Sequence, residues 1–227
     1  MTHVKGKRRY DSTGRQAQAQ RSRQVILDAA ERQFLDTGYA ATTIATIARE
    51  AGVSVETIYK ACGGKSGLVR AIYERGLTGR GAVPAFQRSD EMREHETDPR
   101  TIMRKWGVLA AEVSSVVTPI LLLMRAAAAT NPEMAALLDD IDGERLERAG
   151  HHARFLAARG YLRDGVTVAH ATDILWFCTS VELSETLVLK RGWSSHQYAR
   201  FVADFMITSL LPPHDPNDDP PDMPPDA

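Results

Sequence analysis

Apolar positions recur every three to four residues along most of the chain, which is the period of an α-helix. In one clear case, Ile44, Ile47, Ala48 and Ala51 fall on a single helical face. The alternation typical of half-buried strands is absent, and no Asn-Gly or Asp-Gly hairpin turn separates strand-like runs. The pattern therefore predicts an all-α fold.

Capping residues and glycines divide the first third of the chain into short helices. Ser and Thr side chains accept hydrogen bonds from the exposed N–H groups at a helix start, and glycine readily takes the left-handed conformation that ends a helix. These signals predict four helices: one at about 21–37, one capped by Thr42 or Thr43 and ended by Gly52, one from Ser54 to Gly63, and one from Lys65 to about Leu77.

Longer helices are predicted in the rest of the chain. The polar stretch from Gln87 to Arg100 is expected to be a linker or a poorly packed helix. Beyond it, Pro119 and Pro132 suit the first turn of a helix, where no intrahelical N–H is lost. The predicted helices cover about 99–116, 118–130, 132–160, 167–190 and 194–211.

The two ends of the chain differ in composition from the helical part. Residues 1–20 are polar and basic with few large apolar side chains, and residues 212–227 consist mainly of proline and aspartate. Neither composition can build a core. We therefore expect a basic disordered arm at 1–20 and a disordered tail at 212–227.

The charge is unevenly distributed, although the net charge of the chain is −1. Residues 1–75 contain 13 Lys and Arg against 7 Asp and Glu, whereas residues 76–227 contain 15 against 22. An N-terminal excess of positive charge is typical of a region that meets a polyanion. The alternative is a basic tail that only improves solubility.

Cysteine content and hydropathy favour a cytoplasmic protein without a membrane span. Cys62 and Cys178 are far apart and lack the spacing of a metal site, so neither a disulfide framework nor zinc is indicated. The basic N-terminus has no apolar stretch behind it, unlike a secretory signal. The longest apolar run without a charge, Val113 to Met124, is too short to cross a bilayer.

Two short helices joined by a three-residue turn with glycine, between about Glu50 and Leu68, form a helix-turn-helix pattern. With Ile58 at the centre of the buried face of the second helix, Glu56, Thr57, Tyr59 and Lys60 point outward. The hydroxyl and ammonium groups of these residues suit phosphates and base edges. The alternative is an ordinary solvated helix face.

Lys65 stands at the start of a helix, where a positive charge is locally unfavourable. A phosphate docked there would pair with both the lysine and the exposed N–H groups, and Gly63 and Gly64 would let the backbone approach. Thr43 could contact a phosphate on the other side of the motif. The candidate DNA-contacting residues are Thr43, Ser54, Glu56, Thr57, Tyr59, Lys60 and Lys65.

The sequence ILDAAERQFLDTGYAATTIATIAREAGVSVETIYKACGGKSGLVRAIYERG resembles the TetR family of bacterial transcriptional regulators. The resemblance lies in Gly38-Tyr39 after the first helix, in the pattern TT-I--IA--AGVS--T-Y from Thr42 to Tyr59, and in Lys65. The family usually has Phe where this chain has Cys62, which predicts looser packing of the third helix. A small core residue and a redox-sensitive thiol are both open interpretations of Cys62.

The resemblance implies a domain organisation and a function. Residues 21–80 would form a three-helix helix-turn-helix DNA-binding domain, and residues 81–211 a larger helical domain for ligand binding and dimerisation. Such a protein would act as a homodimer on a palindromic operator. Repression is the expected mode of action, and a small-molecule effector would release the protein from double-stranded DNA. No cofactor is expected.

The C-terminal part independently favours dimerisation through residues 167–211. In the segment 168–189, apolar residues surround the predicted helix, whereas a surface helix needs only one apolar stripe. Large side chains between neighbouring helices also predict a pocket for an apolar or flat ligand, although each could simply be core. The candidate ligand-binding residues are Met103, Trp106, Leu109, Val113, Leu122, Arg125, Trp176 and Thr179.

Arg125 and an acidic cluster leave further alternatives. Arg125 follows Met124 and needs an acceptor, which could be Glu112, another acid or a ligand. The cluster that includes Asp139 and Asp140 could hold metal in an all-α metal-dependent enzyme, but only one such motif is present. A solvated helix face is the simpler interpretation, so the sequence favours a regulator over an enzyme.

Overall fold

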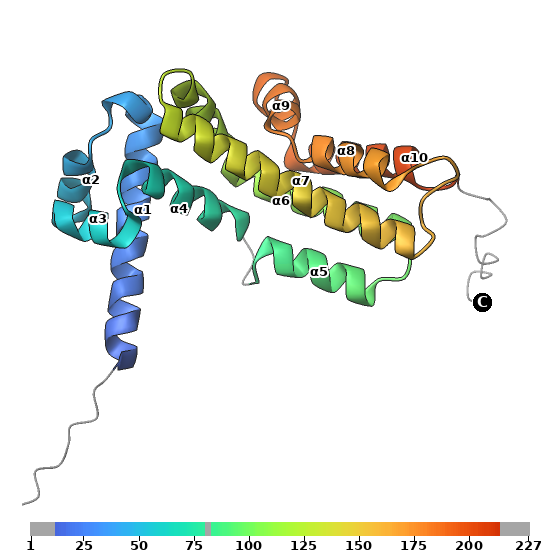
Figure 1. The fold of residues 1–227 in the computed structure, drawn as a ribbon, viewed down its shortest axis with the longest axis horizontal. Helices are drawn as coiled ribbons and strands as arrows, with labels where there is room; N and C mark the ends of the chain where they lie inside the picture. The colour runs from blue at the N-terminus through green and yellow to red at the C-terminus, as the bar shows by residue number, and fades with distance from the viewer. Residues whose placement is uncertain (1–11, 80–82, 214–227) are drawn as a thin grey trace, which may run out of the picture. The chain divides into compact units, whose positions relative to one another are not determined.

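The computed structural model describes residues 12–79 and 83–213, and within these ranges it consists of helices without a strand (Figure 1). The predicted all-α fold is therefore confirmed. The chain divides into two units after Ile72. The helices are α1 (Ser12–Ala41), α2 (Ile44–Ala51), α3 (Val55–Cys62), α4 (Lys65–Leu77), α5 (Ala85–His95), α6 (Pro99–Ala128), α7 (Pro132–Ala158), α8 (Val168–Cys178), α9 (Val181–Ser184), the π-helix η1 (Glu185–Lys190) and α10 (Ser195–Leu210).

The first unit has a small apolar core between α1, α2, α3 and the start of α4. Its completely buried side chains include Ile26, Phe34, Ile47, Ile58 and Leu68. The spacing of these residues is the helical period from which the elements were predicted. The core thus fixes one face of each short helix and leaves the other to solvent.

Local capping sets the ends of α2 and α3 as the sequence predicts. The Thr43 side chain accepts from the N–H of Thr46, and the Ser54 side chain accepts from the N–H of Thr57. Gly52 and Gly63 end the two helices in the left-handed conformation, with φ of 65° and 74°. The turn between the helices is therefore short and closely defined.

The first helix is longer than expected. It begins at Ser12, so residues 12–20 are helical where disorder was predicted. The Gln and Ala residues there are good helix formers that extend the packed part of α1. Gly38, with φ 82° and ψ 165°, interrupts the helix where the sequence indicated a stop. Residues 1–11 of the predicted arm and residues 214–227 of the predicted tail lie outside the described residues.

In the second unit, α6 packs against α5, α7, α9 and α10. The sequence predicted two helices, 99–116 and 118–130, and this is wrong because α6 continues through Pro119. Proline within a helix removes one hydrogen bond, but Val117, Ile120 and Leu121 on either side of it are buried. Packing against neighbouring helices therefore outweighs the local signal.

The predicted helix 167–190 is also wrong in part. It is broken after Cys178 into α8, α9 and η1. Ser180 begins α9 because its side chain accepts from the N–H of Leu183, a local bond that competes with a continuous helix. The polar segment that was expected to be a linker or a poorly packed helix includes most of α5, which begins at Ala85 and buries Ala85 and Ser89.

One close approach and one apolar helix define the centre of the second unit. A Cβ on Gly107 of α6 would lie 2.4 Å from the carbonyl oxygen of Ala199, so glycine allows α6 and α10 to meet.

Among the described residues, α6 is the single helix long and apolar enough to cross a membrane by length and composition. Its most apolar window is 44% buried inside the protein.

Candidate DNA-binding surface and ligand cavity

The recognition face predicted for α3 lies on the surface of the first unit. Ile58 is buried and anchors the helix, whereas Glu56, Thr57, Tyr59 and Lys60 are exposed. Tyr59 is 54% exposed, so its ring and its hydroxyl are both accessible to a binding partner. The face therefore offers one carboxylate, two hydroxyls and one ammonium group to an approaching molecule.

Ser54 and Thr43, which were predicted to contact DNA, are capping residues on the same exposed surface. The Ser54 hydroxyl lies 2.8 Å from the Thr57 hydroxyl, and the Thr43 hydroxyl lies 3.2 Å from the Thr46 hydroxyl. These bonds fix the positions of the hydroxyl groups. Capping uses each hydroxyl oxygen as an acceptor, and the hydroxyl hydrogen can rotate to donate to a phosphate oxygen, so a role in capping leaves room for a contact with DNA.

Lys65 opens α4 as expected, and its ammonium group already has local partners. It lies 4.2 Å from the centre of the Tyr39 ring and donates to the carbonyl oxygen of Ala40 at 3.4 Å. Burial lowers the pKa of Lys65 from its usual value. The cation–π contact explains how a lysine is tolerated at a helix start, and a phosphate contact remains a prediction.

Two residues that support α3 were not found from the sequence. Arg23 of α1 donates to the carbonyl oxygen of Ala61 at 2.7 Å, at the negative end of the α3 dipole. A Cβ on Gly67 would lie only 1.7 Å from the carbonyl oxygen of Cys62. No side chain fits there without backbone movement, so glycine at position 67 allows α4 to pack closely against the end of α3.

Cys62, where the family usually has Phe, is half-buried and accepts a hydrogen bond from Arg23 at 3.5 Å. Burial raises the pKa of the Cys62 thiol, and the positive charge of Arg23 partly offsets this effect. The thiolate is therefore disfavoured at neutral pH, which is typical of a packing residue.

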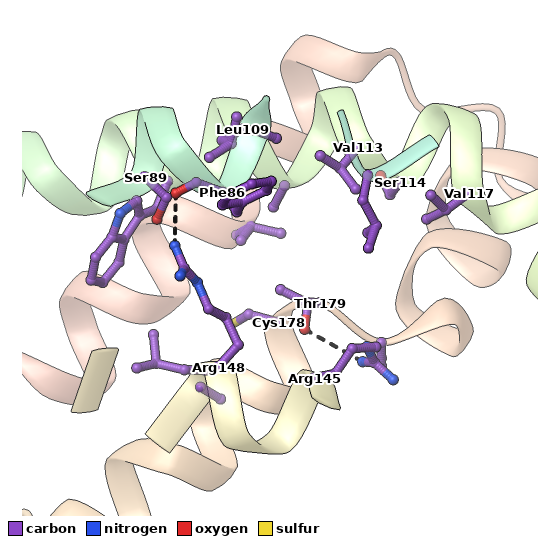
Figure 2. A pocket seen from close by; sticks show the side chains of 18 of the residues that line it. Phe86, Ser89, Leu109, Val113, Ser114, Val117, Arg145, Arg148, Cys178 and Thr179 are labelled. Atoms are coloured by element: carbon purple, nitrogen blue, oxygen red, sulfur yellow. Dashed lines mark hydrogen bonds between the residues drawn. The ribbon is translucent and has the colours of Figure 1, made fainter. Parts of the chain in front are cut away.

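The second unit contains a cavity of about 390 Å³ between α5, α6, α7, α8 and α10 (Figure 2). Four predicted ligand-binding residues line it: Trp106, Leu109, Val113 and Thr179. The other four do not line it: Met103, which is completely buried, and Leu122, Arg125 and Trp176.

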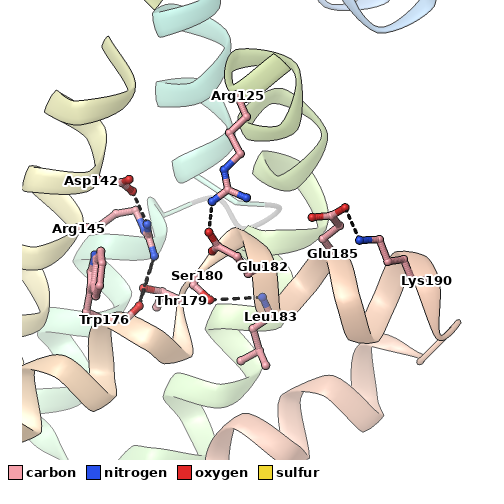
Figure 3. A network of polar contacts seen from close by, with 10 residues as sticks. All are labelled: Arg125, Asp142, Arg145, Trp176, Thr179, Ser180, Glu182, Leu183, Glu185 and Lys190. Atoms are coloured by element: carbon pink, nitrogen blue, oxygen red, sulfur yellow. Dashed lines mark hydrogen bonds and ion pairs between the residues drawn. The ribbon is translucent and has the colours of Figure 1, made fainter. Parts of the chain in front are cut away.

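Arg125 has its acceptor in a neighbouring helix. Its guanidinium pairs with the carboxylate of Glu182 in α9 (Figure 3). Glu112, the partner suggested by the sequence, instead binds Arg88 of α5 through two hydrogen bonds of 2.6 and 2.9 Å. The structure thus places Arg125 in an ion pair between α6 and α9.

Polar residues from α5 and α7 that were not predicted from the sequence line one side of the cavity. Arg145, Arg148 and His152 lie one turn apart on the same face of α7, and Ser89 extends from α5. This spacing of polar residues beside the buried Ala149 is the signal that would have found them. Figure 2 shows Arg145 and Arg148 across from Leu109 of α6.

Both cavity arginines have hydrogen-bond acceptors within the protein. Arg148 donates to Asp90 at 2.7 Å and to the carbonyl oxygen of Phe86 at 2.9 Å. Arg145 donates to Asp142 at 2.6 Å, and its other nitrogen lies 3.4 Å from the Thr179 hydroxyl (Figure 3). Burial alone would raise the pKa of Asp90, but Arg148 and Arg93 lower it below its usual value.

His152 is an uncharged polar group beside the cavity. Its ring centre lies 4.3 Å from that of Trp106, and its Nε2 lies 3.4 Å from the Ser89 hydroxyl. Burial lowers the pKa of His152 to about 3, and the positive charges of Arg148 and Arg93 add to the effect. The imidazole is therefore neutral at physiological pH.

An exposed helix-turn-helix surface and a separate helical unit with an apolar cavity define the class of helical DNA-binding regulators. Residues 26–72 match the family model described as bacterial regulatory proteins, tetR family. The first unit thus matches the DNA-binding domain of the TetR family, as the sequence motifs indicated.

Solved structures agree with this assignment over most of the chain. NalD, the secondary repressor of the MexAB-OprM multidrug efflux pump in Pseudomonas aeruginosa, is 20% identical with a TM-score of 0.62, covering 85% of this chain and 98% of that one. SmeT in complex with triclosan is 21% identical with a TM-score of 0.67, covering 90% and 99%. A putative TetR-family regulator from Syntrophomonas wolfei is 19% identical with a TM-score of 0.68, covering 83% and 94%.

At these identities the similarity establishes the fold. No curated protein matches the chain at a significant level. The fold is that of TetR-family regulators in both units, and the alternative of an all-α metal-dependent enzyme has no support in the comparisons.

Proposed function

We propose that the protein is a cytoplasmic, ligand-responsive repressor that binds a near-palindromic operator as a homodimer. The single observation that carries the proposal is that one chain combines an exposed helix-turn-helix face with an apolar cavity of about 390 Å³. Two similar structures fit this function: NalD is a repressor, and SmeT was solved with the small molecule triclosan bound.

The α3 face would enter the major groove of the operator. A recognition helix places its exposed side chains against base edges, while flanking groups hold the phosphates. In this arrangement Glu56 and Lys60 contribute to base recognition, and Thr57 and Tyr59 donate to phosphates or bases. Thr43, Ser54 and Lys65 contact the backbone at the edges of the motif.

An exposed aromatic surface on α8 and α10 would form the dimer contact within residues 167–211. Phe177 lies 5.9 Å from Phe205, Phe205 lies 6.2 Å from Phe201, and Phe201 lies 5.6 Å from Trp193, between ring centres. Phe177 and Phe201 are 45% and 36% exposed. A contiguous aromatic patch of this kind is typical of a protein interface, and a two-fold symmetric dimer would match a palindrome.

The cavity would receive the effector. A ligand that binds one conformation of the dimer more tightly shifts the population toward it, and release follows if that conformation places the two recognition helices at the wrong spacing for DNA. Trp106, Leu109, Val113 and Thr179 would contact the ligand directly.

The acidic cluster of α7 has a structural role in this proposal. Asp139 and Asp140 are exposed, and Asp142 pairs with Arg145 at 2.6 Å. Across residues 12–79 and 83–213, no group of three or more His, Cys, Asp or Glu side chains is arranged to hold a metal ion. A solvated helix face with one internal ion pair accounts for the cluster.

Selection of bound DNA from a random library tests the function and yields the operator at once. The expected result is a near-palindrome whose half-sites are separated by about one helical turn, roughly 34–36 Å. Binding to it should weaken steeply with added salt. If no sequence is enriched, or if the protein sediments as a monomer at micromolar concentration, the proposal fails.

A further inference from the structure

The cavity has one apolar side and one polar side. Leu109, Val113 and Val117 of α6 line the first side, and Arg145 and Arg148 of α7 line the second (Figure 2). Leu175 of α8 and two residues of α10, Val202 and Met206, add apolar surface. A ligand would therefore bury most of its surface against hydrocarbon, and the chemistry of the polar side decides which ligands fit.

The guanidinium groups on the polar side are already neutralised by the protein. Arg148 binds the carboxylate of Asp90, which also pairs with Arg93. Arg145 binds the carboxylate of Asp142. A ligand carboxylate that approached Arg148 would have to compete with Asp90 for the same N–H groups and would stand next to a like charge.

The charges around the polar side balance. Three guanidiniums, from Arg93, Arg145 and Arg148, are equalled in number by three carboxylates: Asp90 and Asp142, which pair with them, and Glu144, which lines the cavity. His152 adds no charge, since burial lowers its pKa to about 3. An anion entering the cavity would lose its hydration without meeting a net positive charge, which is strongly unfavourable.

We infer that the cavity, as the effector site of the proposed regulator, binds an uncharged and mostly apolar small molecule and excludes an anion of the same shape. This inference rests on the proposed function for its biological role. The ion pairs of Arg145 and Arg148 with the protein's own carboxylates carry it. The ion pair of Arg148 connects α7 to α5, and that of Arg145 lies within α7. Both leave the guanidinium groups poorly suited to hold an anionic head group.

Two fluorescent probes with the same aromatic skeleton provide a matched test. N-phenyl-1-naphthylamine is uncharged, and 1-anilinonaphthalene-8-sulfonate adds one sulfonate. Titration of the full-length protein should give a dissociation constant for the uncharged probe at least about tenfold lower, because the anion is desolvated without gaining a counter-charge. Equal or tighter binding of the sulfonate, or no binding of the uncharged probe, overturns the inference.

Variants should place the uncharged probe in the cavity. Val113→Trp fills space on the apolar side, and Thr179→Trp does so from an exposed position that directly follows α8 and is tolerant of change. Each folded variant, verified by circular dichroism, should weaken probe binding about tenfold or more. Unchanged binding in both variants would mean that the probe lies elsewhere, and the inference would be wrong.

Asp90→Asn tests the charge argument directly. The change removes the carboxylate that neutralises Arg148 and Arg93, so affinity for the sulfonate probe should rise about tenfold while the uncharged probe changes little. Asp139→Asn is the matched control, because it removes an exposed carboxylate of α7 away from the cavity lining. An unchanged ratio of the two affinities in Asp90→Asn would overturn the inference.

The probe titrations need no DNA, so they separate this inference from the proposed function. Operator binding is measured in parallel by fluorescence anisotropy. If the uncharged probe binds as expected but the protein binds no operator, the proposed function fails and the ligand preference stands. If the operator is bound and the sulfonate probe is preferred, the function stands and the inference about the ligand fails.

Discussion

Polar side chains are used in opposite ways in the two units of the protein. On α3 the polar residues Thr57, Tyr59 and Lys60 project to solvent from a face whose apolar side is anchored by Ile58. Around the cavity, Arg145 and Arg148 bind carboxylates of the protein itself. A surface that meets a polyanion receives its opposite charges from the partner, whereas a surface that meets an uncharged molecule must be electrically balanced beforehand.

The largest expected effect concerns the close passage that holds the DNA-binding face in place. Gly67→Ala forces a methyl group against the carbonyl oxygen of Cys62, where the Cβ distance would be 1.7 Å. The free energy of unfolding of the first unit should fall by about 3 kcal/mol or more, because backbone must move. Chemical denaturation followed by circular dichroism measures the change.

Gly143→Ala is the matched control for that substitution. Gly143 lies in α7, and a Cβ added there would meet nothing within 4 Å, so alanine should be neutral or stabilise by up to about 1 kcal/mol. If Gly67→Ala is as stable as Gly143→Ala, the contact between α3 and α4 is looser than the 1.7 Å distance implies.

Lys60 and Lys65 should differ in how they contribute to DNA binding. Lys60→Ala should relax the preference at one base position per half-site, at a loss of roughly 1–3 kcal/mol. Lys65→Ala should weaken all sequences nearly uniformly and lower the salt slope by about 1, because its ammonium lies at a helix start beside Tyr39. Binding to single-base operator variants at several salt concentrations distinguishes the two.

The reverse pattern would change the assignment of the surface. A change of base preference in Lys65→Ala would move base recognition to α4. If Lys65 binds only Tyr39 and Ala40, Lys65→Ala should leave the affinity for the operator unchanged.

Arg23 should matter for operator affinity through its support of α3, without a contact to DNA of its own. Arg23→Met removes the hydrogen bond to the carbonyl of Ala61 at the end of α3 and should destabilise the first unit by about 1.5 kcal/mol. Arg21→Met is the control, because it changes an exposed neighbour whose guanidinium donates to Gln18 within α1. Chemical denaturation and operator titration of both variants measure the loss of stability and of DNA affinity. If the two variants are equally stable, Arg23 does not support α3.

The smallest expected effect is the response of the second unit to acid. The pKa of His152 is lowered to about 3 in the folded protein, so the unfolded chain takes up a proton near pH 6.5 and the folded chain does not. The stability from this group is therefore fully present only well above pH 6.5, and it should fall by about 1 kcal/mol between roughly pH 7 and 5.5. Denaturation at a series of pH values measures it: His152→Leu should lose this dependence, whereas His151→Leu, at an exposed position, should retain it.

The sequence by itself determined α2, α3 and the turn between them. The boundaries of α2 and α3 depend on Thr43, Gly52, Ser54 and Gly63, whose effects extend over one helical turn. The outward direction of the α3 face follows from the helical period once Ile58 is placed in the core. These are local signals, so each can be interpreted without knowledge of distant residues.

Only the tertiary structure decided the continuity of α6, the break after α8 and the lining of the cavity. Pro119 lies within α6 because the helices around it bury the neighbouring residues. Arg125 binds Glu182, 57 positions away, and Arg148 binds Asp90, 58 positions away. Pairing between residues so far apart leaves no periodic trace in the sequence, since its free energy depends on which helices pack together and at what distance.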